Sequence, residues 1–492
     1  MSEAVRTPVD ESPAVADAPS PTRWWALVVL GLTQLMVVLD STIVSIALPS
    51  AQADLGMADD QRQWIITAYA LAFGSLLLLG GRIADYWGRR RAFLTGIIGF
   101  GAASVWGGFA GTAGELIAAR ALQGVFAALL APAALAMLTV IFASGKERNI
   151  AFAIFGIIAG TGAAFGLLLG GVLTQYADWR WCLFVNVFFV IAGVIGAFKF
   201  LVESRAEGNN TYDLLGAVLV TLALGSLVYG FSCAEGGWGE RDTVGFLAAG
   251  VVLLVAFVYS QTKVANPLLP LRVVTHRVRA ASFLLQAFVG AVMMGALLYL
   301  TFHFQLVMGY GPLRAGLASV AMTVVIMATA PISTQMFEKL GARAVLTLGS
   351  LIATVGLLVL SRITPDGTYV SQVLPALVIM ACGFSLIFVP MSNLALVGVA
   401  PHDAGVASAV ANSALNIGGS IAVAVFSALY VSTFDDAMTG GSDPMSAMVD
   451  GYSTTFVGAA VAMFVGAVIC FTLIPKKKDL ELDPSQAAVA MH

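Results

Sequence analysis

Long runs of apolar residues, separated by short polar segments, fill most of this chain. A helix that crosses a bilayer needs about 20 mostly apolar residues. The runs do not alternate between apolar and polar positions, as the strands of a membrane β-barrel do. We therefore predict an all-α membrane protein with fourteen transmembrane helices, at residues 24–48, 64–80, 92–110, 115–140, 150–174, 182–202, 214–233, 243–261, 280–302, 314–335, 344–361, 371–396, 404–431 and 455–474.

The positions of the positive charges support this count, because cytoplasmic loops carry an excess of Lys and Arg. With both ends of the chain inside, nineteen of the 25 Lys and Arg residues fall on the cytoplasmic side and five fall outside, while Arg120 lies within a helix. One missed helix would reverse every later loop. We expect a multi-pass protein of the cell (inner) membrane, with polar, disordered cytoplasmic tails at 1–23 and 475–492.

A weak internal repeat divides the predicted helices into two sets. Asp85 and Gly88, followed by a base, recur as Glu338 and Gly341 at an offset of 253 residues. Parallel repeats of six helices are typical of transporters whose substrate site lies between the halves. We therefore expect two six-helix bundles with an inserted helix pair between them. The predicted boundaries are 24–203 for the N-terminal bundle, 204–265 for the linker and inserted pair, and 266–474 for the C-terminal bundle.

Composition agrees with lipid as the main solvent of the chain. It is 59% hydrophobic and only 11% charged, whereas soluble proteins are about 25% charged. These figures exclude a soluble globular enzyme and a disordered scaffold, and the net charge of −3 offers no basic surplus for nucleic acid. The four cysteines form no CxxC pair and the four histidines show no metal-ligand spacing. We expect no metal and no cofactor.

Asp40 is the most informative single residue. It lies about 24 Å along the first helix from Trp24, at 1.5 Å per residue. An ionisable group inside a membrane costs about 2.5–3.5 kcal/mol on the insertion scale, so it faces the bundle interior and marks a functional site. A carboxylate poised between its charged and neutral forms can carry a proton. The alternative is an acid that only packs helices together through hydrogen bonds.

Arg120 is the matching cation. It lies roughly 7 Å inside the outer end of the fourth predicted helix, at a depth comparable to that of Asp40. The two can form an ion pair if their helices face each other, with Gln123 and Gly124 on the same face as Arg120. We assign Asp40 and Arg120 to proton coupling. The alternative is an arginine that extends to the outer membrane interface.

The loop after the second helix is rich in glycine and positive charge. It contains Gly81, Asp85, Gly88, Arg89 and Arg90. Basic side chains there can bind the negative carbonyl end of a helix, with Asp85 holding one of them. We predict a gating loop that locks one conformation, although positive charge that only anchors topology explains the same residues.

Two further groups of residues complete the expected site. Glycines spaced four apart in the fifth helix permit close helix packing or a hinge: Gly162, Gly166, Gly170 and Gly171. Single polar groups in apolar helices could line a substrate cavity, or could simply form interhelical hydrogen bonds: Gln34, Tyr69, Gln123, Asn186, Gln286, Asn393, Asn412 and Asn416.

Together these motifs resemble the major facilitator superfamily, specifically its fourteen-helix drug:proton antiporter subfamily. The segments that carry the resemblance are Asp40 to Pro49, Gly81 to Arg91, Arg120 to Gly124 and Gly162 to Gly171. The resemblance implies proton coupling through Asp40 and Arg120, gating by the loop, and antiporter switching by the glycines. Two positions depart from the family pattern: Leu167 stands where a proline is usual, and Tyr86 where a base is usual.

The sequence therefore predicts a proton-coupled secondary transporter, not an enzyme, that exports lipophilic drugs or antibiotics by alternating access. The proton gradient is its energy source, the bilayer and a small lipophilic substrate are its partners, and we expect a monomer. A proton-coupled transporter of a physiological metabolite or lipid remains an alternative. A membrane-embedded enzyme would need clustered His, Asp or Cys in the helices, and a channel fits poorly with repeated halves around one buried acid.

Overall fold

The computed structural model describes residues 22–142, 146–205, 213–399 and 404–476. Within these ranges the regular structure is entirely helical. The helices are α1 (Arg23–Leu55), α2 (Asp59–Trp87), α3 (Arg89–Gly108), α4 (Ala113–Ile141), α5 (Lys146–Tyr176), α6 (Trp181–Phe200), α7 (Leu214–Cys233), α8 (Arg241–Gln261), α9 (Leu271–Val274), α10 (Arg277–Gly290), α11 (Leu297–Phe302), α12 (Pro312–Leu360), α13 (Leu374–Ala395), α14 (Ala404–Thr439) and α15 (Pro444–Leu473). Short segments η1 (Ala234–Gly236), η2 (Ala291–Ala296), η3 (His303–Val307) and η4 (Tyr369–Val373) connect or extend them.

Among the described residues, twelve helices are long and apolar enough to cross a membrane. The multi-pass, all-α prediction is therefore confirmed. The exact count of fourteen stays a prediction, and two elements bear on it. Gly341, with φ 78° and ψ 165°, interrupts the 49-residue α12, so this element contains two helices that match the expected 314–335 and 344–361. The 20-residue α3 matches the expected 92–110 but is not among the twelve.

Polar side chains at the helix starts explain several boundaries. Thr112 accepts a hydrogen bond from the backbone N–H of Glu115 at the start of α4, at 3.3 Å. Asp443 accepts two from the first turn of α15. A side chain that binds these unpaired N–H groups stabilises a helix start by about 0.5–2 kcal/mol. The helices predicted at 24–48 and 64–80 are shorter than α1 and α2, because the apolar pattern marks only the part that faces lipid or core, whereas the prediction at 214–233 has the bounds of α7.

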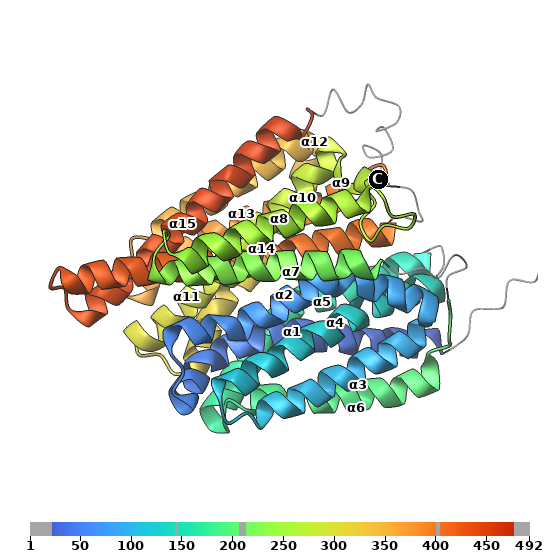
Figure 1. The fold of residues 1–492 in the computed structure, drawn as a ribbon, viewed down its shortest axis with the longest axis horizontal. Coiled ribbons are helices and arrows are strands. Elements are labelled where there is room, and N and C mark those ends of the chain that lie inside the picture. Colours follow the sequence, from blue (N-terminus) through green and yellow to red (C-terminus); the bar gives the residue numbers. More distant parts are fainter. Residues whose placement is uncertain (1–21, 143–145, 206–212, 400–403, 477–492) are drawn as a thin grey trace, which may run out of the picture.

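The helices pack in two groups. In the first, α2 and α3 pack on α4, and α1 packs on α5 and α6. In the second, α12 packs on α13 and α15, and α10 packs on α14 and α15. Figure 1 shows the first group, blue to teal, below the second, yellow to red. We call them the N-half and the C-half. The halves meet where α2 lies along α14 and α5 lies along α12.

The inserted helix α7 lies along the seam between the halves, and α8 packs on α7 (Figure 1). The first of them, α7, contacts α2 of the N-half and α14 of the C-half. Gln63 of α2 donates to the Ser232 hydroxyl of α7 at 3.0 Å. At the other end, the buried Asp213 carboxylate accepts from Gln261 of α8 and from the backbone N–H of Leu268, at 2.6 and 3.2 Å. These hydrogen bonds tie the inserted pair α7 and α8 to the segment around Leu268, which leads into the C-half.

Contacts between the halves define one closed end of the molecule. The start of α1 and the end of α15 lie on the same side in Figure 1. We call the opposite end, where α1 ends and α2 begins, the outer end, after the orientation predicted from the Lys and Arg distribution. There Gln305 of the C-half donates to the carbonyl of Ile46 at 3.0 Å, and the Gln175 side chain accepts from the backbone N–H of Leu313 at 3.2 Å. The halves are therefore joined at the outer end.

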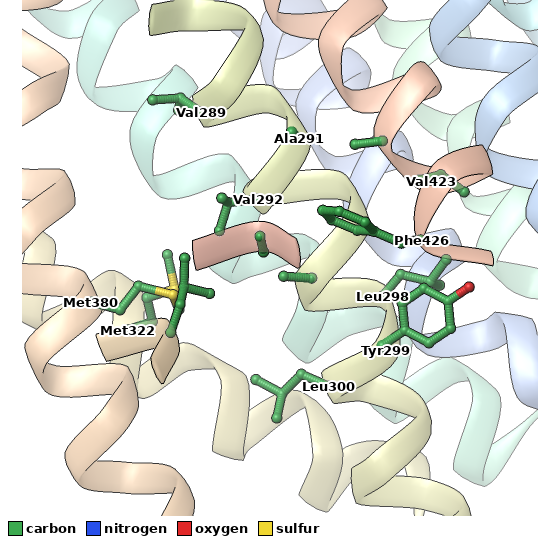
Figure 2. Packing of buried hydrophobic residues seen from close by; sticks show 14 of the residues in the cluster. Val289, Ala291, Val292, Leu298, Tyr299, Leu300, Met322, Met380, Val423 and Phe426 are labelled. Atoms are coloured by element: carbon green, nitrogen blue, oxygen red, sulfur yellow. The ribbon is translucent and has the colours of Figure 1, made fainter. Parts of the chain in front are cut away.

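The C-half has a large apolar core around α10, η2 and α11. Figure 2 shows Val292 and Leu298 from this segment among side chains of neighbouring helices, with Phe426 of α14 and Met380 of α13 close by. Because lipid tails are as apolar as these side chains, close van der Waals packing, and not removal of apolar area from water, stabilises this core. This core fixes the position of η3, which follows α11 at the outer end.

Candidate functional site

Asp40 lies inside the N-half, near the middle of α1. Its exposed fraction is 0%, and the residues of α1 around it, Leu39 and Ile43, are equally buried. An ionised carboxylate withdrawn from water is stable only when it is paired and hydrogen-bonded. The structure supplies such partners to both of its oxygens.

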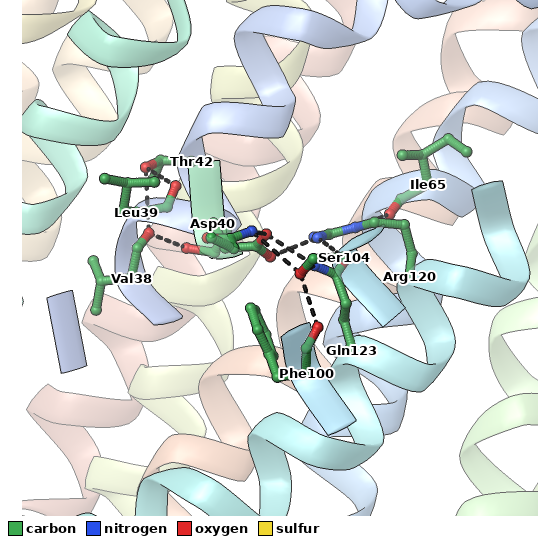
Figure 3. Close-up of polar contacts among 11 residues, drawn as sticks. Val38, Leu39, Asp40, Thr42, Ile65, Phe100, Ser104, Arg120 and Gln123 are labelled. Carbon is green, nitrogen blue, oxygen red and sulfur yellow. Dashed lines mark hydrogen bonds and ion pairs between the residues drawn. The ribbon is translucent and has the colours of Figure 1, made fainter. Parts of the chain in front are cut away.

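One oxygen of Asp40 forms an ion pair with Arg120 of α4, as expected from the similar depth of the two residues in their helices. Oδ2 lies 2.5 Å from Arg120 Nη1, and the arginine is 1% exposed. Arg120 Nε also donates to the carbonyl of Ile65 at 3.1 Å, and its Cζ lies 4.4 Å from the centroid of the Tyr69 ring. Figure 3 shows Arg120 extending from α4 toward Asp40. The two charges are enclosed by α1, α2 and α4.

The second oxygen of Asp40 accepts two amide hydrogen bonds. Gln123 donates at 3.1 Å and Asn186 of α6 donates at 2.7 Å. Both amides also reach the Ser104 hydroxyl of α3, at 2.7 and 3.4 Å (Figure 3 labels Ser104 and Gln123). Asn186 Oδ1 has no hydrogen-bond partner among the described residues. The buried charge thus lies in a network that joins five helices, α1, α2, α3, α4 and α6.

Glycines bring these helices close enough for the network to form. A Cβ on Gly124 would lie 2.4 Å from the carbonyl oxygen of Tyr69, so any side chain there would push α4 away from α2. A Cβ on Gly166 of α5 would lie 2.1 Å from Thr42 Oγ1 and 2.9 Å from the Leu39 carbonyl. Contact of this kind is what small residues at helix interfaces permit. The predicted glycine face of α5 therefore packs on α1 beside Asp40.

The remaining motif glycines extend this face. Gly162 and Gly170 also lie against α1, next to Val38 and Ile43. Gly171 differs, because it faces Pro312 and Leu313 of the C-half. One helix, α5, thus touches both the Asp40 segment and the contact that closes the outer end.

The predicted gating loop lies at the other end of the molecule, and it is not a loop apart from Gly88: α2 extends through Gly81 and Asp85 to Trp87, and α3 begins at Arg89. Asp85 pairs with Arg89 at 2.9 Å. The Glu203 carboxylate after α6 accepts from the backbone N–H groups of Arg90 and Arg91, at 3.1 and 3.2 Å. Gly88 has φ 126°, which disfavours any other residue there. The structure brings Asp85, Gly88, Arg89 and Arg90 together, and adds Glu203, which the sequence did not single out.

The residues expected to line a cavity lie in four different environments. Tyr69 and Gln123 belong to the buried network around Arg120. Gln286 and Asn416 are also buried, Gln34 is half-buried, and Asn393 and Asn412 are exposed. The Asn412 amide donates to the carbonyl of Ser408 on its own helix at 3.0 Å. Their role in substrate binding stays a prediction.

The sequence-based choice of site residues missed Ser104, and it named Asn186 only as a possible cavity-lining group and not as a partner of Asp40. Ser104 and Asn186 lie on α3 and α6, and each is 0% exposed. A serine in an apolar helix gives no signal of its own, and the partner of a lone asparagine depends on how two helices are rotated. Among the described residues, no group of three or more His, Cys, Asp or Glu is placed to hold a metal ion.

Comparisons with known proteins place this geometry among membrane transporters. The sequence profile of the Major Facilitator Superfamily matches residues 30–423. The puromycin resistance protein pur8 of Streptomyces alboniger is 41% identical over 484 residues, covering 97% of this chain and 96% of that protein. The cephamycin export protein CmcT of Amycolatopsis lactamdurans is 37% identical, covering 91% and 92%. The tetracenomycin C resistance and export protein of Streptomyces glaucescens is 32% identical, covering 87% and 80%.

Solved structures agree on the fold. A bacterial homologue of the human lysosomal transporter Spinster, in an inward-facing and occupied conformation, has a TM-score of 0.62 at 16% identity and covers 92% of this chain and 97% of its own. An auto-inhibited POT family peptide transporter has a TM-score of 0.65 at 12% identity, covering 91% and 96%. At these identities the likeness concerns the arrangement of the helices alone.

Proposed function

Because this chain belongs to the Major Facilitator Superfamily, we propose that it exports an antibiotic or a similar lipophilic drug in exchange for protons. It is a multi-pass membrane transporter and not an enzyme, and like other members of the family it works without a cofactor. The observation that carries the proposed export is the 41% identity, over nearly the whole chain, to a puromycin resistance protein. Relatives named for cephamycin and tetracenomycin C point to the same class of activity.

The buried network supports a role for Asp40 as the proton carrier. A proton on this carboxylate would cancel its charge and leave the Arg120 guanidinium as an uncompensated buried cation. Removing one partner of a buried ion pair costs about 3–5 kcal/mol. Protonation of Asp40 would therefore disfavour this packing of α1 against α4.

Packing contacts of α5 connect the Asp40 segment of α1 to the contact between the two halves. Leu39 and Thr42, next to Asp40 on α1, contact Gly166 of α5. Five residues further along α5, Gly171 contacts Leu313 of the C-half. A change in the packing of α1 would thus reach the outer contact through one rigid helix. We assign Gly162, Gly166, Gly170 and Gly171 to this coupling.

The loop between α2 and α3 is assigned to gating on the inner side. Asp85 and Arg89 are paired, while Glu203 holds the start of α3 in place. Release of Asp85 from Arg89 would free a carboxylate for the positive end of a helix in the C-half. We place both tails in the cytoplasm and the protein in the inner membrane, on the strength of the Lys and Arg distribution, and we expect it to act as a monomer.

Purified protein in liposomes tests this function. Substrate-driven proton flux is measured with puromycin and with other antibiotics, for the native chain, for Asp40→Asn and for the matched control Asp450→Asn, whose carboxylate is exposed. We expect flux in the native chain and in the control, and a loss of at least about tenfold in Asp40→Asn. Proton-independent transport by the native chain would exclude antiport, and unchanged coupling in Asp40→Asn would remove that residue from its assigned role.

The substrate itself is best identified by growth. A strain that overproduces the chain is compared with one that lacks it, across a panel of antibiotics and lipophilic cations. We expect increased resistance to at least one antibiotic. Resistance to none, together with altered release of a cellular metabolite or lipid, would favour a physiological substrate.

A further inference from the structure

Aromatic side chains gather at the outer end of the C-half. Tyr430 of α14 stacks on Tyr452 of α15 with ring centroids 5.3 Å apart, and Tyr299 of α11 lies 5.6 Å from Tyr430 and 6.0 Å from Tyr452. Phe302 follows Tyr299 by one turn of α11 and belongs to the same buried core. We call Tyr299, Phe302, Tyr430 and Tyr452 the outer aromatic cluster. All four are at most 3% exposed, so in this conformation the cluster is closed to water.

A cation of the N-half lies against this cluster. Arg62, at the start of α2, is 5% exposed, and its Cζ lies 4.3 Å from the ring centroid of Phe302 and 5.5 Å from that of Tyr430. Both distances fall within the roughly 6 Å over which an aromatic face attracts a cation. Ile65 and Ile66, one turn further along α2, lie in the same buried core as the cluster. The rings of one half thus hold a guanidinium of the other half.

The chemistry of the outer aromatic cluster suits an organic cation. Aromatic rings grouped around a positive charge recognise quaternary ammonium and related ligands, because the negative face of each ring attracts the charge while its apolar surface replaces water. Attraction of this kind selects for positive charge and apolar surface rather than for one pattern of hydrogen bonds. The guanidinium of Arg62 therefore indicates which class of ligand these rings accept.

The aromatic surface continues toward the outside of the molecule. Phe434, one turn beyond Tyr430 on α14, stacks on it with ring centroids 5.8 Å apart. Asp435 and Asp436 follow directly and are exposed. Carboxylates at the mouth of a site raise the local concentration of cations. A cation that leaves the cluster outward would therefore pass an aromatic ring first and negative charge second.

We propose that the outer aromatic cluster is an exit site for organic cations and that Arg62 is a competitor, built into the chain, that empties it. The inference rests on the proposed export function and names its substrate class, a lipophilic compound with a positive charge. When the halves part at the outer end, α2 carries Arg62 away from α11 and α14, and the ring faces become available to the substrate. When the outer end closes, the guanidinium returns to the rings.

Two cations cannot share these rings. The substrate and the guanidinium would use the same ring faces, and their like charges would repel each other in a place where little water screens them. Each closure of the outer end would thus clear the site, and a released drug could not re-enter the closed protein by this path. The exit site and the contact that closes the outer end are in this way the same set of rings.

The proposal predicts opposite signs for the two sides of the contact. Loss of a ring removes attraction for the substrate cation, whereas loss of the Arg62 charge removes its competitor. A contact that only holds the halves together predicts one sign for both changes, since either of them would loosen the outer end. The direction of the change in affinity therefore separates the two roles.

Equilibrium binding of tetraphenylphosphonium to the purified full-length chain, in a nonionic detergent, measures these signs. Tetraphenylborate has nearly the same size and shape but a negative charge, so it controls for apolar binding alone. Arg62→Gln should tighten binding of the cation by about tenfold and leave the anion unaffected. Arg62→Lys, which restores a positive charge, should reverse most of this gain. No antibiotic and no proton gradient are needed, so a failure of this site is distinguishable from a failure of antiport.

Ring variants and a matched arginine complete the test. In the Arg62→Gln background, Tyr430→Leu should weaken cation binding by about tenfold, and Phe302→Leu takes its place if that variant does not elute as a monodisperse protein. Arg180→Gln is the control, because Arg180 lies over the ring of Trp179 at 4.5 Å but both residues belong to the N-half. It should leave the affinity unchanged. Unchanged or weaker cation binding in Arg62→Gln, an equal gain for the anion, or ring variants that bind the cation as tightly as their parent would overturn the proposal.

Discussion

A single pair of side chains, Asp40 and Arg120, carries the charge of the candidate site. Each is at most 1% exposed, and their closest atoms are 2.5 Å apart. The desolvation of two ions is repaid only through such contact and through the amides of Gln123 and Asn186. The intact ion pair therefore contributes little net stability. Removal of either charge is nevertheless costly, because it leaves the other charge buried and unpaired.

This sensitivity gives a prediction for stability. Arg120→Gln or Asp40→Asn alone should lower the free energy of unfolding by about 3–5 kcal/mol, whereas the double variant should lose less than the sum of the two. Thermal unfolding in detergent, followed for all three, gives the ranking. Neutralising the more exposed pair of Asp54 and Arg180, which are 46% and 29% exposed at the side chain, should cost under about 1 kcal/mol. Additive losses in the double variant would show that the two charges act separately.

At the scale of helices, the glycine face of α5 sets the position of α1. Gly166 approaches Thr42 and the backbone of Leu39, and Thr42 Oγ1 bonds to the carbonyls of Val38 and Leu39 on its own helix. Asp40 points away from this contact into the N-half. A shift of α1 against α5 at this level would therefore move the carboxylate relative to α4, while the ion pair of Arg23 and Glu147 joins the two helices at the opposite end.

A methyl group at this interface should disturb transport through packing alone. Gly166→Ala brings a Cβ to 2.1 Å from Thr42 Oγ1, and overpacking of this kind costs about 1–3 kcal/mol. We expect lower thermal stability and a transport rate reduced by about tenfold, with partial recovery when Thr42→Ala is added. Gly156→Ala is the matched control, since no atom lies within 4 Å of its Cβ. Equal effects of the two alanines would contradict the packing role.

Sequence patterns predicted the spans and the Asp40–Arg120 contact, but not its surroundings. Depth along a helix follows from counting residues, so the two charges could be placed at one level. Which amides meet Asp40 depends on the rotation of α3 and α6, and no pattern in an apolar helix records it. Glu203 was missed because it lies in a connecting segment far from Arg90 in sequence. Arg62 counted only as one of the outer charges, since its contact with rings of the C-half emerges only from tertiary packing.

At the scale of the whole molecule, the outer end is the contact that a transport cycle must break. Gln175 and Gly171 of α5 meet Leu313 of α12, and Gln305 meets Ile46 of α1. The inserted α7 contacts both α2 and α14, so it covers the seam along which the halves would move. Rocking of two halves about a fixed site requires that these polar contacts separate while each half stays intact.

A reversible cross-link can therefore separate movement between the halves from movement within one. In a background without native cysteines, Gln175→Cys and Leu313→Cys are joined by a short bifunctional thiol reagent. Since the backbone N–H of Leu313 binds the Gln175 side chain at 3.2 Å, the two thiols lie within its reach. Transport should fall to background and return on reduction, because the substrate can no longer leave through the outer end. The pair Asp54→Cys and Arg180→Cys, both within the N-half, should cross-link without loss of transport. Normal transport by the cross-linked Gln175–Leu313 protein would mean that the halves do not part at this contact, and the alternating-access scheme would then need another opening.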